Sequence, residues 1–229
     1  MAKRSYRHQC SLAQALDVIG ERWTLLVVHE LLVGPHRYKD LLDALPGIGS
    51  KILAARLRTL EDAGVVTRRV LPPPAGSTVY ELTESGEALR PAVASLFQWG
   101  STLPSPTTGR GQASIHCGMF GIQHVLFQPD RARGVRETYE FRIDDEVYHL
   151  EVNDGRATTH VGPAPRADAT FSMDADTFWD LGYGELAPTD ALAAGRGAVS
   201  GDPEAAERCL EMLGLAPLAA RPAPVAVTR

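Results

Sequence analysis

The sequence predicts an α+β protein of two domains joined by a linker, and three observations support this prediction. Residues 34–82 read as a helix, a tight turn, a second helix and two β-rich runs around a Pro/Gly tip. Residues 138–152 alternate with period two, as half-buried strands do. Between these stretches, residues 100–111 are rich in Pro, Gly, Ser and Thr, which is the composition of a linker. The 229 residues suffice for two domains of about 100 residues each.

Residues 34–64 have the helix and turn signals that are typical of a helix-turn-helix. Leucines within residues 41–45 have helical spacing, and Pro and Gly residues within 46–49 mark the turn. Ser50 is the expected cap of a second helix, and Gly64 is its expected end. The apolar face of this helix is expected to consist of Ile52, Leu53, Leu57 and Leu60.

Two β-rich runs, residues 65–70 and 78–82, follow this second helix and flank a loop at residues 72–77. A β-ribbon directly after a basic helix is the winged-helix layout, in which one helix enters the DNA major groove. An ordinary helical hairpin beside a β-ribbon is the alternative interpretation. A winged helix-turn-helix domain is therefore the predicted first half, and DNA is its predicted partner.

The remaining predicted elements differ between the two domains: those of the first are helices, and those of the second are strands and helices. Further helices of the first domain are expected at residues 12–19, 23–33 and 83–99. The second domain is expected to contain helices at residues 115–127, 174–181, 188–194 and 203–213, and strands at 138–143, 146–152, 156–161, 169–173 and 197–200. We predict a first domain of residues 1–103, a linker of 104–112, a second domain of 113–215 and a flexible tail of 216–229.

Composition and charge exclude several classes of protein. No apolar run is long enough to span a bilayer and the N-terminus lacks a signal-peptide core, so we expect a cytoplasmic protein without a membrane partner. The three cysteines have neither metal-ligand spacing nor the pattern of a disulfide framework. The net charge of −5 divides into +2 through Leu103 (twelve Lys/Arg, ten Asp/Glu) and −7 beyond it (eleven Arg, eighteen Asp/Glu). This difference in charge fits a DNA-binding domain joined to a domain that does not contact DNA.

The first half contains a set of short motifs: Cys10, the Leu-Asp-Val-Ile-Gly run at residues 16–20, Trp23, the Gly-Pro-His-Arg-Tyr step at 34–38, and the Leu-x-x-Leu-Glu-x-x-Gly-x-x-x-Arg signature ending at residue 68. With these motifs it resembles the HxlR family of winged-helix regulators over roughly residues 10–100. The resemblance implies a homodimeric, DNA-binding transcriptional regulator that binds a two-fold operator. It also implies that the terminal helices of the domain form much of the dimer interface.

The sequence departs from the family pattern where the second helix would read bases. Gly49 and Ser50 stand where polar residues are frequent, Ala54 and Ala55 stand where longer side chains are common, and Ser77 replaces a basic residue at the wing. Base readout is therefore expected to rest on Ser50, Lys51 and Arg58 alone, with Arg37 and Arg68 as phosphate clamps. The predicted DNA-contacting residues are Arg37, Ser50, Lys51, Arg56, Arg58 and Arg68, although a solvated helix face is the alternative for the basic ones.

The second half contains a Pro-Thr-Asp-Ala-Leu-Ala-Ala-Gly-Arg step at residues 188–196, followed by Gly-Asp-Pro at 201–203. With this motif it is similar to a sterol-carrier-like (SCP2-type) domain over about residues 113–214. The resemblance implies a curved sheet with helices over a cavity for a lipid-like or aromatic ligand. The predicted ligand-binding residues are Phe171, Phe178, Trp179 and Tyr183, for which a purely structural role in the core is the alternative.

Cys10 is a candidate redox or electrophile sensor, because Arg7 and His8 lie close to it in sequence and can favour the thiolate. A buried small apolar residue at a dimer interface is the alternative. Cys117 and Cys209 are expected in the core.

Neither catalytic nor metal-binding groups form a recognisable set. The histidines at 116, 124 and 149 lie on different predicted elements and have no paired carboxylate. We therefore expect no enzyme activity, no metal and no cofactor. The most favoured function is a dimeric DNA-binding regulator whose second domain senses a small apolar ligand. The alternatives are redox sensing through Cys10, and a carrier of apolar ligands whose winged helix serves for pairing.

Overall fold

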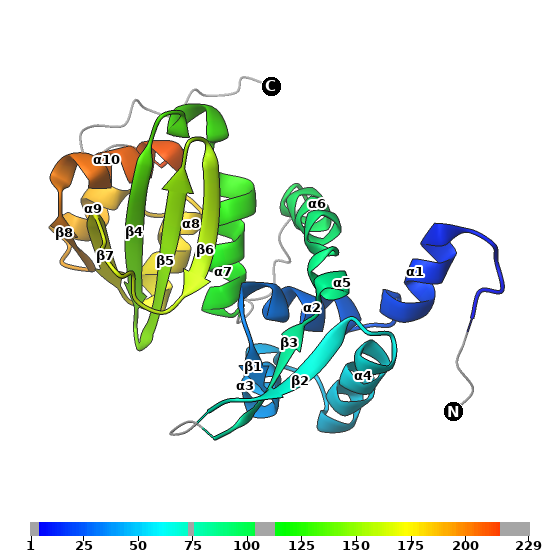
Figure 1. Cartoon of the computed structure of the whole chain (residues 1–229). Helices are drawn as coiled ribbons and strands as arrows, with labels where there is room; N and C mark the ends of the chain where they lie inside the picture. The colour runs from blue at the N-terminus through cyan, green and yellow to red at the C-terminus, as the bar shows by residue number, and fades with distance from the viewer. Residues whose placement is uncertain (1–4, 73–75, 104–112, 216–229) are drawn as a thin grey trace. The chain divides into compact units, whose positions relative to one another are not determined.

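The computed structural model describes residues 5–72, 76–103 and 113–215. The predicted linker at 104–112 and the predicted tail at 216–229 lie outside the described residues. The chain divides into two compact units, Met1–Cys117 and Gly118–Arg229. Both contain helices and a β-sheet, so the predicted α+β fold class is confirmed (Figure 1).

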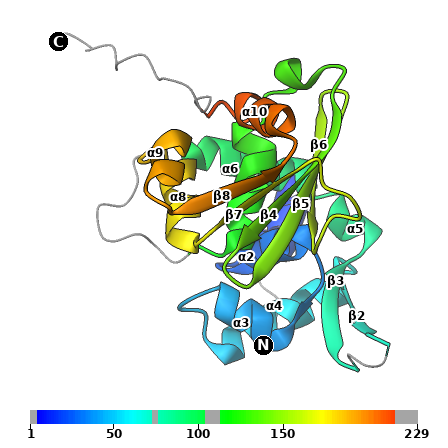
Figure 2. The ribbon, with the colours of Figure 1, turned by 90° about the vertical axis from the view of Figure 1, so that its left-hand side faces the viewer.

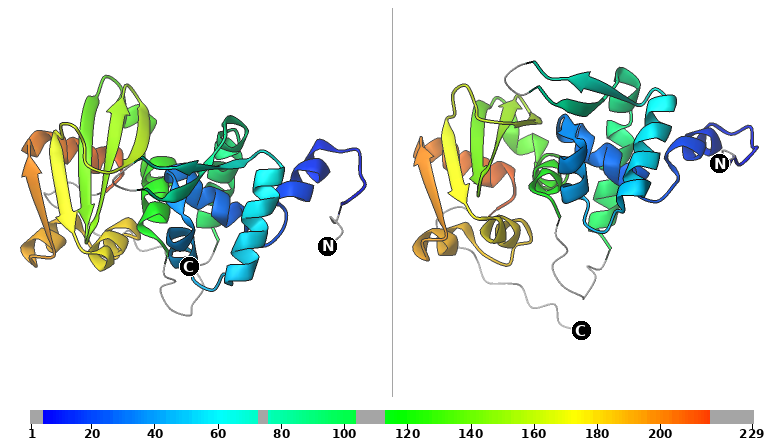
Figure 3. Two further views of the ribbon diagram at one scale, coloured as in Figure 1. Left: turned by 60° about the horizontal axis from the view of Figure 1, so that its bottom comes forward. Right: turned by 90° about the horizontal axis from the view of Figure 1, so that it is seen from below.

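The N-terminal unit consists of helices and a small sheet. Its elements are α1 (Ser11–Ile19), α2 (Thr24–Val33), β1 (His36–Arg37), α3 (Tyr38–Ala44), α4 (Ser50–Asp62), β2 (Val66–Val70), β3 (Thr78–Leu82), α5 (Glu84–Glu87) and α6 (Arg90–Ser101). Helices α3 and α4 form the helix-turn-helix, and β2 and β3 form the wing. Figure 3 shows this ribbon extending from the helices of the unit. The winged-helix arrangement agrees with the sequence-based prediction.

Three details of this unit differ from the prediction. Residues 36–37 form a short third strand, and the sheet order is β1-β3-β2 with antiparallel pairing. The helix expected over residues 83–99 is interrupted between α5 and α6, because Pro91 at the start of α6 has no N–H to continue the hydrogen bonding of α5. Ser50 is the first residue of α4 rather than its cap, which is Gly49.

The core of the N-terminal unit lies between α2, α3, α4 and the sheet. Its fully buried side chains are those of Val27, Val28, Leu41, Leu53, Leu57 and Leu60. Ile52, which periodicity placed on the same face, is instead 42% exposed. At 3.6 residues per turn, Ile52 is offset from the row formed by Leu53, Leu57 and Leu60, and these three leucines already fill the contact with the core.

The C-terminal unit is a five-stranded sheet with helices packed against it (Figure 2). Helix α7 (Ile115–Gly121) continues into a π-helical turn, η1 (Ile122–Leu126), and a 3-10 turn, η2 (Pro129–Ala132). The strands are β4 (Arg136–Ile143), β5 (Glu146–Asn153), β6 (Arg156–Val161), β7 (Ala169–Met173) and β8 (Gly197–Gly201). Helices α8 (Ala175–Gly182) and α9 (Pro188–Ala193) precede β8, and α10 (Pro203–Met212) follows it.

The sheet order is β6-β5-β4-β7-β8. Strands β4, β5 and β6 form an antiparallel meander, and β7 then pairs parallel to β4. The two hairpin turns begin with Asp144 and Asp154, which adopt the left-handed conformation with φ of 50° and 48°. The crossover from β6 to β7 is anchored to the sheet, because the Ala164 N–H donates to the buried carboxylate of Glu140 at 2.8 Å.

Alternation along the strands separates the two faces of this sheet. On β4 and β5, the residues that face the helices are fully or almost fully buried and are Tyr139, Phe141, Ile143, Tyr148, Leu150 and Val152. Helix α10 contacts β4, β7 and β8 on this face. Among the described residues, no helix is long and apolar enough to cross a membrane.

Candidate nucleic-acid interface and apolar cavity

Helix α4 is held in place by one row of leucines. Leu53, Leu57 and Leu60 are spaced by four and three residues, and all are essentially excluded from solvent. Because this row faces the core, the opposite side of the helix faces solvent. The exposed residues of that side are Ser50, Lys51, Ala54, Ala55 and Arg58.

The first turn of α4 has no side-chain cap. Gly49 occupies the N-cap position in an extended conformation and has no side chain to accept the N–H groups of the first turn. A helix N-terminus with exposed N–H groups favours anions through both hydrogen bonding and the helix dipole. This end of α4 is therefore suited to a phosphate of the DNA backbone.

Tyr38, the first residue of α3, reaches the same turn. Its hydroxyl donates to the carbonyl oxygen of Ser50 at 2.7 Å, and the hydroxyl oxygens of the two residues lie 2.8 Å apart. The pair links the first turns of α3 and α4. Ser50, a predicted DNA contact, is thus exposed but already engaged within the protein.

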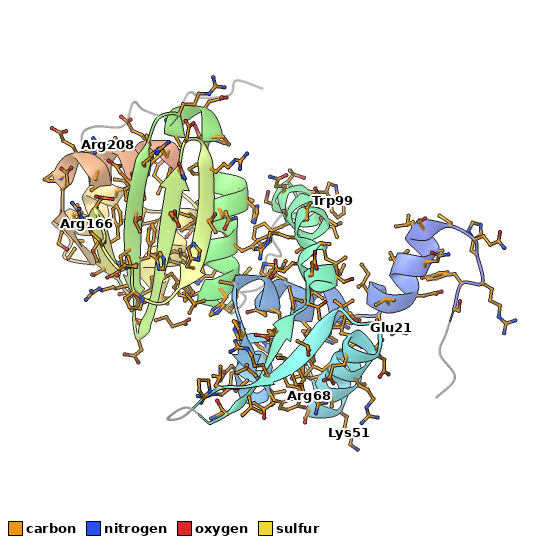
Figure 4. The ribbon with its side chains drawn as sticks, in the orientation of Figure 1. Glu21, Lys51, Arg68, Trp99, Arg166 and Arg208 are labelled. Atoms are coloured by element: carbon orange, nitrogen blue, oxygen red, sulfur yellow. The ribbon has the colours of Figure 1, made fainter. Side chains whose placement is uncertain are left out.

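Three of the predicted cationic contacts are available at the surface. Figure 4 shows Lys51 projecting from α4 into solvent. Arg58, two turns further along the helix, is also exposed, as is Arg37 directly before α3. Within the described part of the chain, none of these three side chains forms an ion pair.

The other two predicted arginines are paired with acids. Arg56 is only partly exposed and lies 3.3 Å from the Glu21 carboxylate. Arg68, on the wing strand β2, lies 2.7 Å from the Glu61 carboxylate and over the ring of Tyr80. A DNA phosphate would have to compete with Glu61 for Arg68, so this arginine is less available as a phosphate clamp than the sequence suggested.

The three cysteines have different environments. Cys10 is the N-cap residue of α1, and hydrogen bonds from the backbone N–H groups of Ala13 and Leu12 lower the pKa of its thiol. Burial, with a smaller contribution from the Glu30 charge, raises the pKa of Cys117 to about 12. Burial also raises the pKa of Cys209, which is fully enclosed in the second unit. The thiolate is therefore favoured at Cys10 alone.

The C-terminal unit contains an apolar cavity between its sheet and helices α8, α9 and α10. The cavity is lined by Phe171, Ser172, Met173, Thr177, Leu181, Pro188, Ala191, Leu192, Gly197, Ala198, Val199 and Leu210. Its volume is about 40 Å³ as swept by the centre of a water-sized sphere. The lining has no acidic, basic or thiol side chain, so the cavity is suited to apolar matter.

Of the four aromatic residues predicted to bind a ligand, only Phe171 lines this cavity. Helix α8 directs Thr177 and Leu181, four residues apart, into the cavity, and its other residues consequently point elsewhere. The ring of Trp179 contacts Phe178 edge-on at 5.4 Å and stacks on Tyr183 at 5.6 Å, measured between ring centroids.

These three aromatic residues form a separate cluster that packs on α7. A side chain at Gly118 would lie 2.3 Å from the Phe178 ring, so the glycine is what permits this close approach. Phe178, Trp179 and Tyr183 therefore lie outside the lining of this cavity, and their predicted role in ligand binding stays a prediction.

The histidines do not form a metal site in the described residues. His149 and His160 face each other on β5 and β6 with their rings stacked at 4.8 Å, and His160 lies 3.7 Å from Glu151. No group of three or more His, Cys, Asp or Glu side chains in the described ranges has the arrangement of metal ligands.

Comparison with known proteins assigns both units to families. The sequence matches the HxlR-like helix-turn-helix family over residues 18–107 and the SCP-2 sterol transfer family over residues 123–213. The HTH-type transcriptional regulator YodB of Bacillus subtilis (strain 168) is 36% identical over 95 residues, which cover 42% of this chain and 85% of YodB. The chain belongs to the HxlR-like helix-turn-helix family.

Other similar proteins match the same part of this HxlR-like chain. The uncharacterized HTH-type transcriptional regulator YvaP of B. subtilis is 35% identical over 94 residues, covering 41% of this chain and 87% of YvaP. The solved structure of reduced YodB is 35% identical, with 43% and 98% of the two chains covered and a TM-score of 0.38. The structure of the redox regulator HypR in its oxidized form is 31% identical, with 42% and 100% covered and a TM-score of 0.40.

This HxlR-like protein is therefore a DNA-binding transcriptional regulator with a second domain of the SCP-2 type. Its sequence indicated the basic residues of α4 and β2 but not their acidic partners. Glu61 precedes Arg68 by only seven residues, yet the two meet only because β2 runs back along α4. Glu21 and Arg56 are 35 residues apart, and no local pattern signals that pair.

Proposed function

We propose that this regulator binds a two-fold operator as a homodimer, and that a small apolar molecule in the C-terminal cavity sets its affinity for that operator. The cavity carries this proposal. Its lining is apolar, and all of its lining residues lie in the region that matches the SCP-2 sterol transfer family.

Exposed apolar side chains on the terminal helices of the N-terminal unit support a dimer. Leu12 on α1 is 67% exposed, and Trp99 on α6 is 62% exposed. Leu96, one turn before Trp99, is also half exposed. Large apolar side chains grouped on two helices are typical of a surface that another protein covers. A second copy would also supply the second recognition helix that a two-fold operator requires.

The size of the cavity limits what it can hold. A cavity in which about 40 Å³ is open to the centre of a water-sized sphere is small. A short alkyl group fits such a space, whereas a sterol requires α8 or α9 to move away from the sheet. Either kind of ligand alters DNA binding only if it prefers one of two arrangements of the protein.

The proposed role is binding rather than catalysis. Ser172 and Thr177 are the polar side chains of the cavity lining, and neither has an adjacent base among the other lining residues. A molecule bound in the cavity would therefore contact apolar side chains but no side chain that could act as a general acid, general base or activated nucleophile.

The test begins with operator selection from random duplex DNA, using the full-length protein. The dissociation constant for the selected operator is then measured with hexanol, indole or palmitate at saturation. We expect one of these probes to shift the operator affinity. Ala191→Leu, which fills the cavity, should abolish that shift, and Ala193→Leu on the exposed side of α9 should retain it. Equal operator affinity with and without every bound probe would refute the ligand response.

Redox sensing through Cys10 is a second candidate, because the Cys10 pKa is lowered at the start of α1, a proposed dimer helix. The thiolate attacks hydrogen peroxide, the O–O bond breaks, and the products are a sulfenic acid and hydroxide. Cys10→Ser should then abolish the response of operator binding to peroxide while leaving the affinity of the untreated protein unchanged. An undiminished peroxide response in Cys10→Ser would exclude this mechanism.

A further inference from the structure

The contact between Tyr38 and Ser50 lies where a recognition helix meets bases. In helix-turn-helix proteins, the N-terminal residues of the second helix contact base edges in the major groove. Ser50 is the first residue of α4 and is exposed. Tyr38 reaches it from α3, with 2.7 Å to its carbonyl oxygen and 2.8 Å to its hydroxyl oxygen.

Counting hydrogens favours one direction for each of the two bonds. A carbonyl oxygen only accepts, so the hydroxyl hydrogen of Tyr38 is donated to the Ser50 carbonyl. Either hydroxyl could supply the hydrogen between the two hydroxyl oxygens at 2.8 Å, but two separate hydrogen bonds form only if Ser50 supplies it. In that arrangement Ser50 has no hydrogen left to donate outward, and its hydroxyl presents only lone pairs to a ligand.

This polarity decides which groups of DNA Ser50 can bind. Phosphate oxygens, guanine O6 and N7, adenine N7 and thymine O4 are all acceptors, and an acceptor-only hydroxyl gains nothing from them. The donors in the major groove are the amino groups, N6 of adenine and N4 of cytosine. A serine whose hydroxyl can rotate binds either kind of group, whereas Ser50 is restricted to the amino groups.

We propose that Tyr38 is a specificity-determining positioning residue, which makes Ser50 accept a hydrogen bond from the amino group of an adenine or cytosine in the operator. The inference rests on the DNA-binding function of the N-terminal unit and is independent of the proposed ligand response. Ser50 thereby reads a base and does not hold a phosphate.

A purely structural role for Tyr38 makes a different prediction. If the hydroxyl only fastened α3 to α4, its removal would weaken binding to all operator variants by a similar factor. The proposed role changes the preference at one base pair. The measurement must therefore compare affinities across base pairs and not only the affinity for the best operator.

The first step locates the base pair that Ser50 contacts. Full-length wild-type protein and Ser50→Ala are titrated against operators that carry each single base-pair substitution. We expect Ser50→Ala to lose discrimination at one position per half-site and to retain it elsewhere. Discrimination equal to that of the wild type at every position would overturn the proposal.

The second step removes single groups at that base pair. One duplex lacks the amino group: purine replaces adenine, or 2-pyrimidinone replaces cytosine. The other duplex lacks the major-groove carbonyl oxygen of the partner base, which is thymine O4 or guanine O6. Loss of one hydrogen bond should weaken wild-type binding about three- to ten-fold for the amino-deleted duplex. The carbonyl-deleted duplex should bind wild type nearly as well as the parent, and Ser50→Ala should be insensitive to both deletions. A wild-type loss confined to the carbonyl-deleted duplex would overturn the proposal.

The third step tests Tyr38 itself with Tyr38→Phe, which keeps the ring and removes only the hydroxyl. The Ser50 hydroxyl can then rotate and donate, so the preference for the amino-bearing base should shrink by at least about half. An unchanged preference in a folded Tyr38→Phe protein would assign Tyr38 a structural role only. The Ser50→Ala and base-deletion measurements decide the acceptor role of Ser50 even if Tyr38→Phe does not fold.

Discussion

The two units of this regulator carry their functional groups in opposite places. In the N-terminal unit the candidate DNA contacts lie on the surface of α4, and the interior is built mainly from aliphatic side chains, with the leucine row of α4 among them. In the C-terminal unit the proposed ligand cavity is interior, between β7, β8 and three helices, and the solvent-facing side of the sheet is polar. Binding at the surface of α4 depends on which side chains are left without a partner in the protein. Binding in the cavity depends on which face of each helix is turned toward the interior.

The strongest test of this comparison is to damage the interior of the N-terminal unit. Leu57→Ala should lower its free energy of unfolding by about 2–5 kcal/mol, because Leu57 is fully buried and the site cannot collapse completely. The unfolding transition of the C-terminal unit should stay unchanged. Differential scanning calorimetry resolves the two transitions, with exposed Arg58→Ala as the control.

If Leu57→Ala instead showed one unfolding transition for the whole chain, shifted to lower temperature, the division into two separately stabilised cores would be contradicted. Loss of indole or palmitate binding in Leu57→Ala below its first transition would contradict it as well.

The cysteines provide the next largest contrast between surface and interior. At pH 7 the Cys10 thiol, whose pKa is lowered, should react with iodoacetamide at least about 100-fold faster than Cys209, whose thiol is buried and whose pKa is raised. Mass spectrometry of each cysteine-containing peptide over time gives the individual rates. Cys117, with a pKa of about 12, should react slowly as well. Comparable rates of reaction with iodoacetamide at all three cysteines would contradict the difference in burial and pKa between them.

The sequence predicted the helix-turn-helix of the N-terminal unit well, but it missed two smaller features of that unit. The positions of α3 and α4 follow from leucine spacing and from the Gly and Pro residues between the helices, all of which are local signals. The short strand β1 was missed because two residues form a strand only where β3 passes beside them. The interruption between α5 and α6 was missed although Pro91 signals it, because the apolar spacing continues across the proline.

The cavity could not be predicted in detail, for a physical reason. Helix α8 carries three large apolar side chains, Phe178, Trp179 and Leu181, which at 100° per residue spread over roughly 160° around its axis. Periodicity does not show which part of this wide apolar surface meets β7 and β8. The large aromatic side chains were the natural candidates for a ligand site, yet they pack on Gly118 of α7. Only the three-dimensional arrangement assigns the smaller Thr177 and Leu181 to the cavity.

The surface of α4 provides a third and smaller test. Lys51→Ala and Arg58→Ala should each weaken operator binding by roughly ten-fold and reduce the salt dependence, log Kd against log salt, by about one unit. Arg56→Ala should have a smaller effect on both quantities, because Arg56 is paired with Glu21. Fluorescence anisotropy with labelled operator at several salt concentrations measures all three variants. An Arg56→Ala effect equal to that of Arg58→Ala would contradict the distinction between paired and unpaired arginines.

The smallest effect is expected from the ion pair that joins α10 to β4. Burial alone would raise the pKa of Glu137, but hydrogen bonds from Arg208 and Tyr139 and the Arg208 charge outweigh burial and lower it. Arg208 Nη2 lies 2.6 Å from Glu137 Oε1. Because the pKa is lower in the folded protein, the stabilisation is complete above the unfolded value of about 4.5 and is lost as the pH falls through the folded value.

The Glu137–Arg208 pair is partly exposed, so it should contribute no more than about 1 kcal/mol to the C-terminal unit at neutral pH. Urea unfolding at pH 6, 4 and 3 should show a loss of stability that is smaller in Glu137→Gln than in wild type. Asp145→Asn, at an exposed turn of the same sheet, should follow the wild-type pH dependence. If Glu137→Gln also follows the wild-type curve, the acid sensitivity of the C-terminal unit arises from other carboxylates, and the contact of α10 with the sheet depends on its buried apolar residues alone.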